Sequence, residues 1–141
     1  MNRALAANTI FAQGWLMKLK WKKYDHGTID DALSESFCLY VFHHPKDDDL
    51  PYYIGKARFF GTNQPSGYKG SARYNGGYVH LLAGILRSGF NLYIAKIGEK
   101  DFVNVEGYEQ GLISLWNPIR PQRRKAKIRL PVETIKPWGG S

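Results

Sequence analysis

Hydrophobic and aromatic positions cluster into short runs that predict β-strands. The aromatic and β-branched run at 37–42 predicts one strand, and the run at 52–54, closed by Gly55, predicts its partner across a turn at 45–49. A similar run at 91–97 predicts a third strand. The pattern therefore indicates a hairpin with a long loop, followed later by one more strand.

Two later segments show the spacing of amphipathic helices. Residues 78–87 place apolar side chains on one face at about 100° per residue, and Gly89 provides a C-terminal stop. That apolar face consists of Tyr78, Leu81, Leu82 and Ile85. Asn104 can cap a second helix that runs to Trp116, and Pro118 ends it.

This order of elements predicts an α+β fold with a small antiparallel three-stranded sheet flanked by helices. A chain of 141 residues fits a single globular domain. Within it we expect an N-terminal helical extension over residues 1–36, a core over 37–122 and a basic C-terminal tail over 123–141. Residues 4–13 fit a short helix, whereas the mixed apolar and basic run at 15–23 fits either a strand or a helix.

The charge distribution indicates a polyanionic partner. Twenty Lys and Arg against twelve Asp and Glu give a net charge of +8. Residues 118–141 contain seven basic residues and one acid, and residues 61–100 contain five basic residues and one acid. Residues 101–117, in contrast, contain three acids and no base. Basic segments around an acidic patch suit a polyanion held next to a metal site, but a solvated basic surface would have the same composition.

The sequence also limits the compartment and the redox chemistry. Cys38 is the only cysteine, so neither a disulfide framework nor a cysteine metal site is expected. No apolar run approaches the ~20 residues of a membrane span, and no secretory signal is recognisable at the N-terminus. The alanine-rich start could suit a transit peptide, but a Trp-rich segment follows it directly. We expect a cytoplasmic protein.

The helix ending at Trp116 contains an acid within its apolar stripe. The stripe is formed by Val105, Tyr108, Leu112, Ile113 and Trp116. Glu109 falls inside it, about 40° from Val105 and about 20° from Trp116, whereas Glu106 and Gln110 are expected to point away. An uncompensated buried carboxylate costs several kcal/mol, so Glu109 should bind a metal, lie at a cleft or pair with a buried Arg or Tyr.

Two other groups of residues could take part in chemistry. Tyr40 and Tyr53 lie on adjacent predicted strands and can point to one face of the sheet, where their hydroxyls could contact a phosphate or a water. Tyrosines in strands are also common packing residues. His43 and His44 with the acids at 47–49 could bind a metal, but a solvated hairpin tip is the favoured interpretation.

The spacing of these motifs resembles the paired signature of GIY-YIG nucleases. The segment from Tyr53 to Ala57 reads Tyr-Ile-Gly-Lys-Ala and matches the second half of the signature. Twelve residues separate Tyr53 from Tyr40, the tyrosine of the first half, where Cys38 and Leu39 replace the family's Gly and Ile.

Two downstream segments extend the resemblance over residues 37–122. Arg73, followed by Gly77-Tyr78 and His80, resembles the arginine and histidine region of the family's first helix. The segment from Glu109 to Ile113, followed by Asn117-Pro118, resembles its metal-binding glutamate helix. Three motifs in the family's order are far more specific than any one of them.

The resemblance implies a Mg²⁺-dependent endonuclease that hydrolyses phosphodiester bonds in DNA, with Mn²⁺ able to substitute. The implied catalytic residues are Tyr40, Tyr53, Lys56, Arg73, His80 and Glu109. Glu109 would hold the metal, Arg73 would stabilise the phosphate, and Tyr40 would activate the attacking water. Lys56 would lower the pKa of Tyr40, Tyr53 would orient the water or phosphate, and His80 would contact a phosphate or relay a proton.

The sequence departs from the family pattern at two positions. The gap between Gly55 and Arg73 is longer than in short family members, so Arg58 competes with Arg73 for the arginine role. The family's late asparagine is replaced by Pro121, for which Asn117 or Gln122 could substitute.

Further basic and polar residues are expected to contact the nucleic acid. They are Arg58, Lys69, Arg87, Asn117, Arg120, Arg123, Arg124 and Lys125. Two other functions are compatible with the sequence: a nuclease that acts on RNA or branched junctions, and a non-catalytic binding module. The sequence leaves open whether the protein is a monomer or a homo-oligomer.

Overall fold

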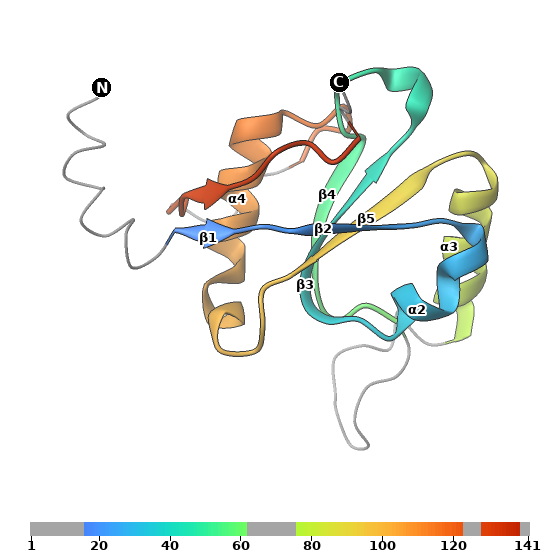
Figure 1. The fold of residues 1–141 in the computed structure, drawn as a ribbon, viewed down its shortest axis with the longest axis horizontal. Helices are drawn as coiled ribbons and strands as arrows, with labels where there is room; N and C mark the ends of the chain where they lie inside the picture. Colours follow the sequence, from blue (N-terminus) through green and yellow to red (C-terminus); the bar gives the residue numbers. More distant parts are fainter. Residues whose placement is uncertain (1–15, 62–75, 123–127, 139–141) are drawn as a thin grey trace.

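The computed structural model describes residues 16–61, 76–122 and 128–138, with the side chains of 76–79 excepted. Figure 1 shows an antiparallel sheet with helices on both sides of it. The fold is therefore α+β, as predicted. In the described part of the chain, no helix is long and apolar enough to cross a membrane.

The main sheet has four strands, so the predicted three-stranded sheet is wrong. Its order is β2 (Trp21–Tyr24), β5 (Asn91–Lys96), β3 (Ser36–His43) and β4 (Tyr53–Phe59), and every neighbouring pair is antiparallel. The extra strand comes from the run at 15–23, which fitted strand or helix. Strand β2 forms because Tyr24 is buried in the core and Trp21 packs against Trp116.

A second, two-stranded sheet joins the two ends of the described chain. Strand β1 (Met17–Lys18) pairs in parallel with β6 (Val132–Glu133). Residues that we placed in an N-terminal extension and a C-terminal tail thus pack on the same body as the core. Short helical segments fill the connections: η1 (His26–Thr28), α2 (Ile29–Leu33), η2 (Pro45–Asp47) and η4 (Asp101–Asn104).

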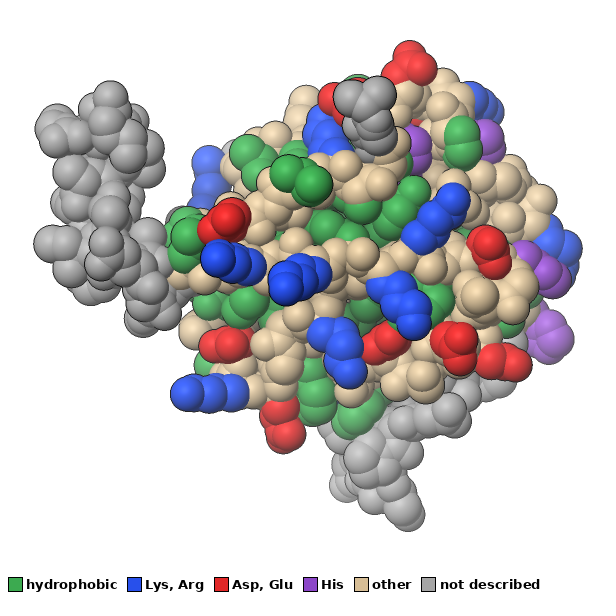
Figure 2. All heavy atoms as spheres, viewed as in Figure 1, with side chains coloured by type: hydrophobic (Ala, Val, Ile, Leu, Met, Phe, Trp, Pro, Cys, Tyr) green, Lys and Arg blue, Asp and Glu red, His purple; other side chains and the backbone are tan. Residues whose placement is uncertain are grey.

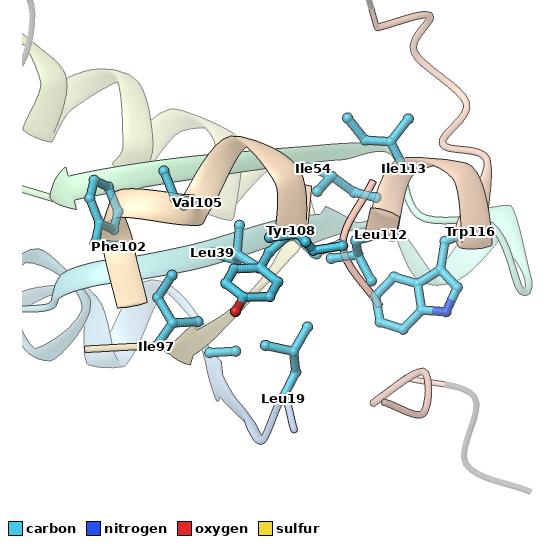
Figure 3. Packing of buried hydrophobic residues seen from close by; sticks show 13 residues of the cluster. Leu19, Leu39, Ile54, Ile97, Phe102, Val105, Tyr108, Leu112, Ile113 and Trp116 are labelled. Carbon is cyan, nitrogen blue, oxygen red and sulfur yellow. The ribbon is translucent and has the colours of Figure 1, made fainter. Parts of the chain in front are cut away.

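The two long helices pack on opposite faces of the main sheet. Helix α3 (Gly76–Arg87) covers the face that carries Cys38 and Tyr40, together with α2. Helix α4 (Val105–Trp116) covers the face that carries Leu39 and Ile54. Figure 3 shows Tyr108, Leu112 and Trp116 pointing from α4 towards the strands. The sheet is therefore buried on both faces, and β2 and β4 form its two edges.

Helix α3 ends at Arg87 as predicted, but it begins two residues earlier, at Gly76, and has a different buried face. Leu82 and Leu86 are buried, whereas Leu81, which we placed on the apolar face, is 58% exposed. The stripe is rotated because the helix packs through its i, i+4 pair at Leu82 and Leu86 rather than through Leu81. Gly89 ends the segment with φ +101°, as predicted.

Helix α4 is enclosed from a second side, which the sequence pattern did not predict. Leu130 packs against Gly107 and Gly111 so closely that a Cβ on Gly111 would lie 2.2 Å from the Leu130 carbonyl oxygen. Gln110, expected to point to solvent, is buried at 2% exposure. Asn104 precedes the helix but makes no side-chain capping bond, because the turn η4 already leads into it.

Candidate nuclease site at the β4 edge

Gly55 lies in the middle of β4, although we expected it to end that strand. It stands opposite Tyr40 of the central strand β3. A Cβ on Gly55 would lie 2.3 Å from Tyr40 Cζ and 2.5 Å from its hydroxyl oxygen. Only glycine leaves room for the Tyr40 ring at this position. The ring therefore lies across β4, and its hydroxyl points towards the outer edge of this strand.

The two tyrosines of the paired motif share one face of the sheet, as predicted. Their ring centroids are 6.2 Å apart. Tyr40 is also held edge-on by Phe60, at 5.0 Å, and by Phe42, at 5.8 Å. Such aromatic packing fixes the ring in one orientation, so the hydroxyl is presented at a defined place.

Glu109 reaches the same strand from the other face. It is buried to 8% exposure, and its Oε1 lies 3.3 Å from Lys56 Nζ. This outcome resembles the buried ion pair that we considered for Glu109, with a lysine as the partner instead of Arg or Tyr. Lys56 follows Gly55 directly. The Tyr40 ring at Gly55 and the ion pair at Lys56 therefore lie on opposite faces of β4, at neighbouring residues.

The ion pair corrects the expected position of Lys56. We placed Lys56 next to Tyr40, but alternation along β4 directs it to the face of α4, opposite Leu39 in the register. The contact that the structure gives Lys56 is with the Glu109 carboxylate. Lys56 therefore compensates the buried charge of Glu109.

Two arginines extend the positive charge along this edge. Arg58 is exposed, and its guanidinium rests over the rings of Phe102, at 5.1 Å, and Phe37, at 5.8 Å. Arg120 is also exposed and lies 5.6 Å from the centre of the Tyr53 ring. Cation–π contacts of this kind hold a charge in place at a surface.

Gln122 binds the open edge of β4 through its side chain. Its Oε1 accepts a hydrogen bond from Ile54 N at 2.8 Å, and its Nε2 donates to Ile54 O at 2.5 Å. The backbone amides of Ile119 and Arg120 donate to Pro51 O and Tyr52 O. The segment after Pro118 is thus aligned beside Tyr53. Of the two candidates to replace the late asparagine, Gln122 lies at the edge but its amide is occupied by the backbone.

Three other predicted site residues belong to helices α3 and α4 or to their ends. Asn117 is exposed and forms the left-handed C-cap of α4 at φ +51°. His80 is exposed on α3, as expected. Arg87 lies at the end of the same helix, where its Nη1 is 3.2 Å from Nε2 of His26 on η1. Four predicted contacts with nucleic acid, as well as the preferred arginine, lie outside the described residues: Lys69, Arg73, Arg123, Arg124 and Lys125.

The histidines at the hairpin tip have structural roles. His43 is buried, stacks on Trp138 at 4.6 Å, and its Nε2 lies 2.7 Å from Asp48 O. His44 Nδ1 accepts a hydrogen bond from Lys46 N. Within the described ranges, no three His, Cys, Asp or Glu side chains group in a way that could hold a metal ion. The alternative of a metal site at this tip therefore finds no support.

Cys38, which stands at a glycine position of the motif, is buried beneath the sheet. Burial raises the pKa of its thiol to about 12, with a further contribution from the nearby Glu35 carboxylate. A neutral, buried thiol is neither a nucleophile nor a metal ligand at neutral pH. The substitution therefore adds a packing residue to the first half of the motif.

Glu109 fits a magnesium ion only as one of several ligands. Mg²⁺ usually keeps several waters and binds proteins through one or two carboxylates together with substrate phosphates. Glu109 supplies one carboxylate, so the remaining ligands would be waters and a phosphate. No protein-family model, curated protein or solved structure matches the chain.

Proposed function

We propose that the protein is a GIY-YIG-type endonuclease that hydrolyses phosphodiester bonds in DNA with the help of Mg²⁺. The observation that carries the proposal is the crossing of Tyr40 over Gly55, with the Glu109–Lys56 pair at the next residue of β4. Gly55 has no side chain, and the Tyr40 hydroxyl can therefore reach the edge of β4.

In this mechanism the scissile phosphate lies along the edge of β4. Tyr40 accepts the proton of the attacking water, and Tyr53 orients the water or the phosphate from the same face. Arg120, held over Tyr53, and Arg58, two residues beyond Lys56, attract the flanking phosphates. A divalent ion bound through Glu109 would supply Lewis-acid stabilisation of the phosphate and the leaving oxygen.

Lys56 has a defined part in this proposal. It neutralises Glu109 before substrate binds, since the two groups are 3.3 Å apart. If Glu109 held a metal ion, the Lys56 ammonium would be free to contact a phosphate oxygen. Metal affinity should therefore be low without DNA and should rise when a phosphate is present.

The same ion pair favours one alternative, a non-catalytic module that binds nucleic acid. A carboxylate already paired with a lysine can serve the fold alone. The two proposals differ in what happens to the backbone of bound DNA.

A plasmid-nicking assay with Mg²⁺ or EDTA tests the proposal. The parent should convert supercoiled to open-circular DNA only with Mg²⁺, and Glu109→Gln should lose this activity but retain DNA binding. Glu106→Gln is the matched control, because Glu106 is exposed on the same helix. Retained binding without nicking by the parent would favour the non-catalytic module. Duplex RNA and a four-way DNA junction, tested as further substrates, would reveal a different substrate class.

A further inference from the structure

A row of lysines follows the edge of the sheet that lies opposite the candidate site. Four of the six residues from Lys18 to Lys23 are lysines, and all four are exposed: Lys18, Lys20, Lys22 and Lys23. They lie on β1, on β2 and on the residues between these strands. Figure 2 shows basic side chains crossing the molecule along this path. We call these four residues the lysine edge.

The lysine edge is rigidly supported from beneath. Leu19 and Tyr24 are buried at 6% and 1% exposure, and Trp21 Nε1 donates to Thr134 Oγ1 at 2.7 Å. Lys22 Nζ lies 5.4 Å from the centre of the Tyr24 ring, so its side chain is on the face of Tyr24. Alternation places Lys23 on the other face. The charges therefore project to both sides of a fixed strand.

No ion pair within 4.0 Å compensates these charges among the described residues, although Glu133 stands opposite Lys18 in the register of β1 and β6. The ion pairs of the described residues involve Lys56, Lys96 and Lys136, and none involves the lysine edge. At the end of β2, Asp25 accepts a hydrogen bond from Gly27 N in the cap of η1. Like charges this close together along the chain repel one another.

The spacing of the lysine edge suits a polynucleotide backbone. Residues i and i+2 of a strand are about 6.6 Å apart, and each strand of a duplex carries one phosphate per about 3.4 Å of helix axis. Lys20 directly precedes β2, and two residues of extended chain reach at most about 7 Å, so Lys20 and Lys22 span about two phosphates. Arg87, placed next to β2 by its contact with His26, adds a fifth positive charge near this edge.

We propose that the lysine edge binds the sugar–phosphate backbone of duplex DNA as a contact separate from the site at β4. Three strand spacings separate β2 from β4, or about 14 Å, so the two contacts engage different phosphates. The choice of DNA as the polyanion rests on the proposed function. The contact involves only the charged phosphates, so binding at this edge should be independent of the DNA sequence.

Anisotropy of a labelled 20-base-pair duplex in EDTA tests the inference without cleavage. The Lys20→Gln/Lys22→Gln variant is compared with the control Lys46→Gln/Lys100→Gln, which removes two exposed lysines at other sites and has the same net charge. Loss of two phosphate contacts should flatten the slope of log affinity against log salt by about 1.8 and weaken binding roughly tenfold at 0.15 M salt. The control variant should change the salt slope and the affinity by only a small fraction of these amounts. Melting temperature should stay level or rise in the Lys20→Gln/Lys22→Gln variant, since a repulsion is removed.

Several outcomes would overturn the inference. The first is equal affinity and salt slope in the two double variants. The second is self-association of Lys20→Gln/Lys22→Gln in gel filtration at unchanged DNA affinity, because lysines on edge strands also prevent sheet-to-sheet pairing. The third is loss of binding to phosphatidylserine vesicles with DNA binding intact, which would assign the edge to a membrane. A parent that fails to nick plasmid but loses DNA affinity through these lysines would refute the proposed nuclease function and leave this inference standing.

Discussion

The close passage of Tyr40 over Gly55 makes Gly55→Ala the most specific test of the site. The added methyl would lie 2.3 Å from Tyr40 Cζ, a distance that requires the ring to move. The ring cannot slide freely, because Phe60 and Phe42 hold it edge-on from two sides. Either the ring shifts by about an ångström or β4 separates from β3.

The expected magnitude follows from these contacts. Overpacking a well-packed interior by one methyl costs about 1–3 kcal/mol of unfolding free energy. A misplacement of about 1 Å at a reacting group lowers a rate by roughly 100-fold. We therefore expect Gly55→Ala to be modestly less stable and to nick plasmid about 100-fold more slowly than the parent at saturating DNA.

Gly84→Ala provides the control for a glycine-to-alanine change. Gly84 lies within α3, and a Cβ there would meet nothing within 4 Å. It should raise the unfolding free energy by up to about 1 kcal/mol, because alanine favours a helix more than glycine does. Urea unfolding of both variants measures the free energy of unfolding, and single-turnover nicking measures the cleavage rate. Parental stability and rate in Gly55→Ala would refute the inferred ring position.

Two further predictions concern groups on the same face of the sheet. Tyr40→Phe should slow single-turnover cleavage by roughly two to four orders of magnitude and remove the rise of rate with pH that a tyrosine base produces; an unchanged pH profile would assign the base to another residue. Cys38 has a folded pKa of about 12 against an ordinary value of 9.0, so it stabilises the fold fully below pH 9, and this contribution is lost as the pH rises towards 12. The excess stability of the parent over Cys38→Ala should thus fall by roughly 2–3 kcal/mol between pH 8 and pH 11 in urea unfolding; a constant difference would contradict the raised pKa.

The elements with strong periodicity were predictable from the sequence, whereas their partners were not. The first strand of the hairpin, the third strand and the two long helices lie close to where the patterns placed them, whereas β4 continues past Gly55 to Phe59. The fourth strand was missed because Trp21 and Tyr24 are three residues apart and flank two lysines, so the run lacks clean alternation. Its place in the sheet depends on pairing with β5, some 70 residues later in the chain.

The burial of Gln110 illustrates a different limit. Helical periodicity describes one apolar face, and it correctly placed Glu109 within the buried stripe of α4. A second layer, formed where Leu130 packs on Gly107 and Gly111, covers part of the remaining surface. Two glycines four residues apart on one helix face were the available signal, since they allow a backbone to approach closely.

The position of Lys56 was also available in the sequence, and it changes how Tyr40 could be activated. Tyr53 and Lys56 are an odd number of residues apart on one strand, so they face opposite sides of the sheet. Tyr40 lies on the side of Tyr53, and therefore Lys56 belongs with Glu109. The charge that helps a tyrosine to ionise must then come from another element or from a bound metal. Because Lys56 of β4 pairs with Glu109, Arg73 becomes the residue to test next as the partner of Tyr40.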